Sequence, residues 1–182
     1  MLTATELGDY IDTRATRSIF RLELLDHYEV ASDGGDFARY LKGDAAPMAE
    51  RKRPWLAKLA AEREAGIRRQ RVHVLSTPLT AYLRYECEWG YVPNAAAGEE
   101  ILIIDTTEVD QPDGLVDHDF WLIDDSHAIT MRYDESSRFV GAEPVDEPDR
   151  YRCARDAAVA MAEPFASWWA RHPEEWRDQH PV

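Results

Sequence analysis

The apolar run EILIID at residues 100–105 constrains the fold more than any other segment of this chain. Such a run, without alternation of polar and apolar residues, is typical of a strand buried on both faces. A strand-like segment at residues 70–76 comes earlier, and residues 78–90 between them have a helical pattern. This strand–helix–strand unit favours a parallel pair with a right-handed crossover. Ligands of open α/β sheets tend to bind at the carboxyl ends of the strands, here near Ser76 and Asp105.

Three further strands are expected after a polar loop, at residues 120–123, 129–133 and 139–145, with a turn at residues 124–126. A helix should follow from Asp149 to about His172. Its apolar side includes Tyr151, Ala158, Phe165 and Trp168, and Pro164 should kink or split it. The predicted class is α/β (α+β): a mixed sheet with a βαβ unit, a three-strand meander and a C-terminal helix.

The first 66 residues predict a smaller region of helices and one strand. Thr3 and Glu6 have the spacing of a capping box, so a helix should run to about Thr13. A strand is expected near residues 20–24, a short helix at residues 36–41, and a longer helix from Pro54 to Gly66. We expect residues 1–66 to pack on an α/β core of residues 67–182, within one globular domain overall.

Charge is unevenly distributed along the chain, whose formal net charge is −14. This net charge argues against direct binding of nucleic acid. Residues 51–71 hold eight basic residues against two acids, whereas residues 99–125 hold ten acids and no lysine or arginine. Either the two segments face each other or are solvated, or the basic segment binds an anion or a partner.

The sequence gives no sign of export, a membrane span, a metal site or a cofactor. The N-terminus has no basic and apolar leader, and no apolar run approaches the length of about 18 residues that a membrane helix needs. The two cysteines, Cys87 and Cys153, form no C-x-x-C pair. We therefore expect a cytoplasmic protein without a bound metal or cofactor.

Glu86 is the most informative candidate for a site because it falls on the apolar face of the helix expected at residues 78–90. An unpaired carboxylate there would be costly, so Arg69, Arg71 or His73 of the preceding strand should reach it. The alternatives are a buried ion pair, a ligand contact and a general base. Arg84 should pair with Glu88 on the outer face.

Two further positions complete the candidates. His118, between Asp117 and Asp119, can serve as a metal or catalytic group or simply end a solvated loop. Asp125 belongs to the expected turn, and Trp121 can line a pocket near it or pack in the core. The candidate ligand-binding set is therefore Glu86, Arg71, Arg69, His73, Arg84 and Trp121, with His118 and Asp125 as weak catalytic candidates.

Several stretches resemble an uncharacterised family of bacterial proteins, mostly from actinobacteria. These are RVHVLSTPLTAYLRYECEWGYVPNAAAGEEILIID, DFWLIDDSHAITMRYDESSRFVGAEPV and ARDAAVAMAEPFASWW, and FRLELLDHYEV near the start fits too. Members of that family often accompany helix-turn-helix regulators, so the resemblance implies a regulatory setting and a regulator of that kind as a partner.

The order of the expected elements is also similar to one half of a phospholipase D-like fold, whose motif is H-x-K-x-x-x-x-D. His118, Phe120 and Asp125 stand at the three motif positions, so phenylalanine replaces the cation that this chemistry places on a phosphate. Arg132 and Tyr133 hold the place of its Gly-Ser element. The resemblance implies a degenerate half, similar to the non-catalytic relatives that act as sensor domains.

Three hypotheses remain. The leading one is a non-enzymatic regulatory or sensor-like protein that binds a small ligand or a protein partner, since G-x-S-x-G, P-loop and G-x-G-x-x-G motifs are absent. A second is a phosphoesterase or nuclease-type enzyme that uses His118, Asp125 and Glu86. A third is an acidic, antitoxin-like or DNA-mimicking protein. Tryptophans, if exposed, would suit a homodimer interface: Trp168, Trp169 and Trp176.

Overall fold

The computed structural model describes residues 1–29 and 35–179. Within these ranges no helix is both long and apolar enough to cross a membrane. The elements, in chain order, are α1 (Ala4–Arg14), β1 (Ser18–Glu23), α2 (Asp36–Leu41), α3 (Ala49–Glu64), β2 (Arg68–Leu75), α4 (Ala81–Tyr85), the π-helix η2 (Glu86–Tyr91), α5 (Val92–Ala97), β3 (Glu100–Asp105), β4 (Phe120–Ile123), β5 (His127–Tyr133), β6 (Phe139–Val145), α6 (Pro148–Met161), β7 (Glu163–Pro164), α7 (Phe165–Arg171), and the 3₁₀ turns η3 (Pro173–Glu175) and η4 (Arg177–Gln179).

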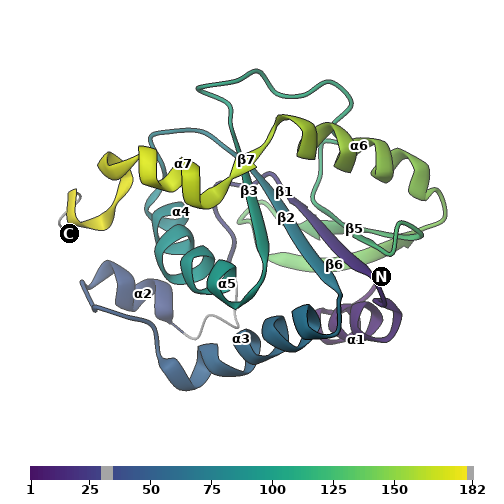
Figure 1. Cartoon of the computed structure of the whole chain (residues 1–182), viewed down its shortest axis with the longest axis horizontal. Helices are drawn as coiled ribbons and strands as arrows, with labels where there is room; N and C mark the ends of the chain where they lie inside the picture. The colour runs from purple at the N-terminus through teal and green to yellow at the C-terminus, as the bar shows by residue number, and fades with distance from the viewer. Residues whose placement is uncertain (30–34, 180–182) are drawn as a thin grey trace.

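A seven-stranded mixed sheet in the order β6-β5-β4-β1-β2-β3-β7 forms the centre of the molecule (Figure 1). Strands β1, β2 and β3 are parallel to one another, and β4 joins β1 in antiparallel fashion. The predicted βαβ unit is confirmed as β2, the helical segment α4–α5 and β3. The predicted meander is confirmed as β4, β5 and β6. The fold is therefore mixed α/β. Strand β1 lies inside the sheet, so the first 66 residues contribute an inner strand.

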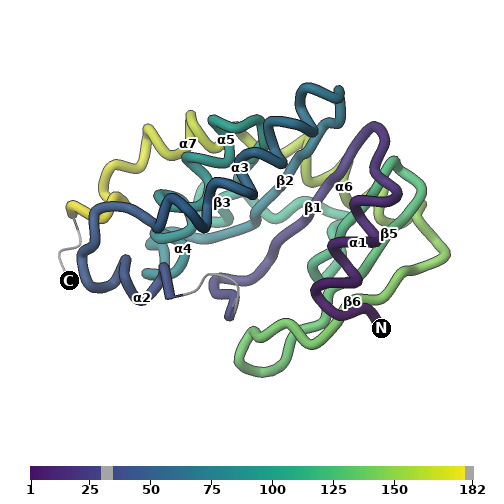
Figure 2. Tube along the Cα trace, turned by 90° about the horizontal axis from the view of Figure 1, so that it is seen from below, coloured from purple at the N-terminus to yellow at the C-terminus, as the bar shows by residue number. Residues whose placement is uncertain are grey.

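Helices cover both faces of the sheet. On one face α6 packs against a cluster that includes Leu22, Val72 and Phe120. The opposite face carries α1 over β4–β6, and α4, η2, α5 and α7 over β2 and β3. Figure 2 shows α1 beside β6, and α3 beside α5, on this second face. Because both faces are covered, polar positions of the inner strands are buried as well as apolar ones.

The C-terminal helix is split, and its two halves lie on opposite faces of the sheet. Helix α6 ends at Met161, β7 pairs with β3 as the edge strand of the sheet, and α7 begins at Phe165. Ala158 of α6 belongs to the core on one face, whereas Phe165 and Trp168 belong to the core on the other. The prediction of a single apolar side was therefore wrong. Pro164 has no N–H to continue the helix, and the break carries the chain around the sheet edge.

The local predictions for the N-terminal region hold, with one shift. Thr3 and Glu6 form both hydrogen bonds of the predicted capping box at the start of α1. Helix α2 spans the predicted residues. Helix α3 begins at Ala49 rather than at Pro54, so Pro54 lies inside the helix. The predicted start was wrong because it relied on the preference of proline for the first turn of a helix.

The helical segment between β2 and β3 contains a π-helix that sequence periodicity did not predict. Thr80 caps α4 by accepting a hydrogen bond from Leu83 N at 3.1 Å, so Pro78 lies outside the helix. From Glu86 to Tyr91 the helix widens to π geometry before α5 continues it. Such widenings are frequent at functional sites, and this one places Glu86 against the sheet.

Candidate functional site

One face of the inner strands carries charged side chains. Arg21 and Glu23 of β1 share this face with Arg71 and His73 of β2, because the pairing sets Arg21 beside Arg71 and Glu23 beside His73. Glu23, Arg71 and His73 are buried. Burial of these groups is tolerable only when each finds a charged or hydrogen-bonding partner. The covering helices and the strands themselves supply those partners.

Glu23 lies at the centre of this buried network. Its Oε1 is 2.7 Å from Arg21 Nη2, and its Oε2 is 2.7 Å from Arg71 Nη1. The Tyr91 hydroxyl lies 3.1 Å from Glu23 Oε2 and 2.6 Å from His73 Nδ1. Burial by itself would raise the pKa of Glu23, but the two guanidinium groups outweigh it and hold the pKa at about 2. Glu23 is therefore ionised at neutral pH.

Arg71 is shared among three glutamates. Besides Glu23, its Nη2 lies 3.0 Å from Glu99 Oε1, and Asn94 donates to the other oxygen of Glu99 at 2.9 Å. The third glutamate, Glu86, comes only to 3.7 Å from Arg71 Nη1. The short contacts of Arg71 thus go to Glu23 and Glu99.

Glu86 is the least compensated member of the network. Of the three partners expected for Glu86, Arg71 is the one within ion-pair distance. The Oε2 atom of Glu86 is buried without a hydrogen-bond partner. Burial and the nearby Glu23 carboxylate raise the pKa of Glu86 to about 7, although His73 and Arg71 oppose the rise. The network therefore contains one carboxyl group that changes charge near neutral pH.

Arg69 and Trp121 lie on the same face but form a separate contact. Arg69 Nε lies 2.6 Å from Glu62 Oε2 of α3. Its guanidinium group lies 5.0 Å from the ring centroid of Trp55 and 5.8 Å from that of Trp121. Cation–π packing and an ion pair with α3 account for these two residues.

Arg84 departs from its expected pairing with Glu88. Its Nη2 lies 2.8 Å from Glu175 Oε2 in the C-terminal segment, and Glu88 instead accepts a hydrogen bond from Arg177 N at 2.6 Å. The i,i+4 rule failed because both side chains find partners in the segment after α7, which sequence spacing cannot show.

His118 and Asp125 lie at opposite ends of β4. His118 contacts the Tyr151 hydroxyl at 3.1 Å and Asp117 at 2.9 Å, beyond the amino end of the strand. Asp125 follows its carboxyl end and pairs with Arg155. The structure does not bring these two residues together.

The basic and acidic segments meet where β2 and β3 run side by side. Arg68 Nη2 lies 2.6 Å from Glu100 Oε2, and Arg71 pairs with Glu99. The interpretation that the two segments face each other holds for these pairs.

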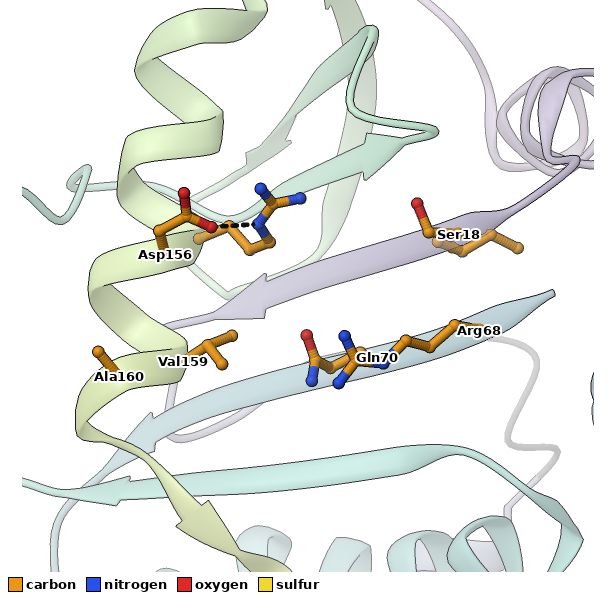
Figure 3. A pocket seen from close by; sticks show the side chains of 8 residues that line it. Ser18, Arg68, Gln70, Asp156, Val159 and Ala160 are labelled. Carbon is orange, nitrogen blue, oxygen red and sulfur yellow. Dashed lines mark hydrogen bonds and ion pairs between the residues drawn. The ribbon is translucent and has the colours of Figure 1, made fainter.

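A groove opens between α6 and the amino ends of β1 and β2, with a volume of about 440 Å³. Figure 3 shows Ser18 on β1, Arg68 and Gln70 on β2, and Asp156, Val159 and Ala160 on α6 around it. Ile19 and Arg155 complete the lining. Its size is that of small-molecule sites in general, and it lies at the end of the strands opposite to the expected one.

Two guanidinium groups give this groove its electrostatic character. Hydrogen bonds that Arg68 donates to Glu100 raise the pKa of Arg68, whereas burial and the repulsion from the like charge of Arg155 oppose that rise. Arg155 is held by Asp125 and Asp156. An anion between the two arginines would remove the repulsion.

Sequence reasoning missed Arg21, Glu23, Arg68 and Arg155. Arg21 and Glu23 are the polar positions of an alternating strand, a pattern ordinarily assigned to a solvent-facing side. They are covered here because helices cover both faces of the sheet. Arg68 was seen only as part of the basic segment, and no pattern links it to Arg155, which is 87 residues later in the sequence.

The structure defines a mixed α/β protein with a groove of about 440 Å³ between its sheet and α6. The family model described as Domain of unknown function (DUF6879) matches residues 5–170, and the chain belongs to this family. A search of curated proteins found no match to the chain.

Proposed function

We propose that the protein is a non-enzymatic regulatory protein that binds a small organic anion in the groove between α6 and the β1–β2 edge. The observation that carries the proposal is the placement of Arg68 and Arg155 in one groove, on the sheet and on the helix. Val159 and Ala160 of α6 add apolar surface beside them. This combination suits a carboxylate or phosphate attached to an apolar body.

The lining supports binding rather than catalysis. It contains no histidine, cysteine or lysine among the described residues, and these are the groups that most often serve as general bases or nucleophiles. Both guanidinium groups already hold carboxylates, but the pair of Arg68 with Glu100 is exposed. Exposed pairs contribute about 0–1 kcal/mol, so a ligand anion can replace such a partner.

Benzoate and benzamidine test this proposal because they share a ring and differ in the sign of their charge. We expect benzoate to raise the melting temperature and benzamidine to leave it unchanged. Arg68→Gln and Arg155→Gln should each weaken benzoate binding roughly tenfold, since a hydrogen bond to a charged group contributes about 1.5–3 kcal/mol.

Arg132→Gln is the matched control, because the Arg132–Glu143 pair is as exposed as the Arg68–Glu100 pair. It should bind benzoate as the wild type does. Equal effects of the two probes, or equal losses in all three variants, would contradict the proposal.

The partner in this proposal is a helix-turn-helix regulator, and the family resemblance of the sequence supports it. Co-expression of the chain with a regulator encoded beside it, followed by size-exclusion chromatography, tests this part. Co-elution that changes when benzoate is added is the expected result. Separate elution under both conditions would remove the regulator from the proposal.

A further inference from the structure

Three side chains that neither the groove nor the buried network uses meet at the carboxyl end of β3. Asp105 ends that strand, Glu108 lies in the turn after it, and His172 directly follows α7. One nitrogen of His172 and one carboxylate oxygen from each acid lie within 4.8 Å of one another. Asp105 and His172 are buried and Glu108 is exposed. No sequence motif links the three, because His172 is far from the acids along the chain.

The imidazole of His172 is oriented as that of a metal ligand. Its Nδ1 lies 2.8 Å from Glu174 Oε1, and a carboxylate only accepts, so Nδ1 carries the proton. Nε2 is buried, has no hydrogen-bond partner and lies 3.2 Å from Glu108 Oε1, outside hydrogen-bond geometry. His172 is only 8% exposed. A histidine that donates one ring N–H to a carboxylate and turns the other nitrogen to a cation is the usual arrangement around bound metals.

The two carboxylates are held in place and still have free lone pairs. Asp105 Oδ1 accepts from Thr107 N at 3.0 Å and from the Thr107 hydroxyl at 2.7 Å, and Oδ2 accepts from Trp168 Nε1 at 3.3 Å. Both oxygens of Glu108 accept from Arg171. Asp105 Oδ2 and the two Glu108 oxygens can each accept a further contact, so both groups can coordinate an ion without losing these bonds.

The charge around the cluster favours a cation. Arg171 pairs with Glu108 and also with Glu163, and Glu174 adds a further carboxylate at His172. The cluster and its direct partners therefore hold four carboxyl groups, counting Asp105, and one guanidinium group. A doubly protonated His172 would offset one negative charge, whereas a divalent ion would offset two.

We propose that Asp105, Glu108 and His172 bind a divalent transition ion of the Zn²⁺ or Mn²⁺ class, which links the end of β3 to α7. Ligand atoms around a tetrahedral zinc ion lie about 3.3 Å apart, so small side-chain movements close the set. Water completes the coordination. An imidazole ligand disfavours Mg²⁺ and Ca²⁺, which bind through oxygen. This site lies outside the groove of the proposed function and stands independently of it.

Titration with Zn²⁺ and with Co²⁺, after dialysis of the protein against a chelator, tests the site. Calorimetry should give one Zn²⁺ per chain, and Co²⁺ should produce a visible d–d absorption and quench tryptophan fluorescence. The quenching is expected because the ring of Trp168 lies 4.7 Å from that of His172. Mg²⁺ at the same concentration should bind much more weakly. His172→Gln and Glu108→Gln should each lower Zn²⁺ affinity roughly tenfold or more.

His118→Gln is the matched control, since His118 also contacts a carboxylate but has a hydroxyl partner at Nε2. It should bind Zn²⁺ as the wild type does. Because Glu108 is exposed, Glu108→Gln should fold normally. It can therefore decide the test even if the buried His172→Gln variant fails to fold. Wild-type Zn²⁺ affinity in Glu108→Gln, or no saturable Zn²⁺ binding by the wild type, would overturn the proposal.

Discussion

Glu86 lies 3.7 Å from Arg71, yet one of its carboxylate oxygens is buried without a hydrogen-bond partner. Arg71 makes its shorter contacts with Glu23 and Glu99, so it is shared among three glutamates. Arg21 is a second cation, but it pairs with Glu23. Buried networks that are only partly satisfied cost stability relative to fully paired ones. Glu86 is therefore where the fold should respond most strongly to protonation.

Replacement of Glu86 by glutamine should make stability less dependent on pH. Burial raises the pKa of Glu86 from an ordinary 4.5 to about 7 in the folded protein. A raised carboxyl pKa leaves stability intact below pH 4.5, lowers it as the pH rises to about 7, and leaves a constant penalty above that. Above pH 7, Glu86→Gln should be more stable than the wild type by about 2–3 kcal/mol. Urea unfolding at several pH values measures the difference.

The control for this prediction is Glu143→Gln, which changes an exposed glutamate that pairs with Arg132. Its stability relative to the wild type should stay nearly constant over the same pH range. If the difference between Glu86→Gln and the wild type is also constant between pH 4.5 and 7, then Glu86 does not titrate as we expect.

Two arginines of the same strand should differ sharply in their contribution to stability. Arg71→Met leaves Glu23 and Glu99 buried with too few partners, and loss of one member of a buried pair costs roughly 3–5 kcal/mol. Arg68→Met breaks an exposed pair with Glu100, which should cost about 0–1 kcal/mol. Chemical denaturation of both variants measures the contrast, and similar losses would show that the Arg71 network is not the buried centre we describe.

Asp124 ties the β4–β5 turn to the chain that enters β1. Its carboxylate accepts hydrogen bonds from the backbone N–H groups of Thr16, Arg17 and Ser18. Burial would raise the pKa of Asp124, but these bonds and that from the Thr16 hydroxyl lower it to about 2. A lowered pKa stabilises the fold above about pH 4, and this contribution is lost as the pH falls toward 2.

Asp124→Asn tests that contribution without changing the backbone preference, since asparagine also tolerates the positive φ of 50° found there. We expect a loss of about 1–2 kcal/mol at pH 7, with the difference from the wild type shrinking below pH 4. Thermal unfolding at pH 7 and pH 3 measures it. A loss of the same size at both values would assign the effect to geometry rather than charge.

Much of the fold could be predicted because its signals are local. The run from Glu100 to Asp105 and the capping box of Thr3 and Glu6 specify a strand and a helix start without help from distant residues. The split at Pro164 was also visible, but the crossing to the other face was not, because it depends on the pairing of β7 with β3.

The candidate site was less predictable because it depends on contacts between distant segments. Glu86 could be recognised from its helical phase alone. The environment of Glu86 could not be predicted, because it depends on Glu23. Glu23 lies 63 residues earlier, on a strand whose alternating pattern predicts one exposed face. The groove could not be predicted either, because Arg68 and Arg155 come from separate elements and neither belongs to a motif.

If the groove between α6 and β1–β2 binds a small anion through its arginines, salt should weaken this binding. Benzoate affinity should fall when sodium chloride is raised from about 50 mM to about 500 mM, that is, from below to above physiological ionic strength. An affinity that is indifferent to salt would mean that the arginines do not hold the carboxylate.

An amide ¹H–¹⁵N spectrum of the labelled protein, titrated with benzoate and separately with benzamidine, locates the binding site residue by residue. We expect benzoate to shift the signals of the groove, including those of Ile19, Gln70 and Val159, and benzamidine to leave them unchanged. Benzoate shifts scattered outside the groove, or no saturable shift at all, would contradict it.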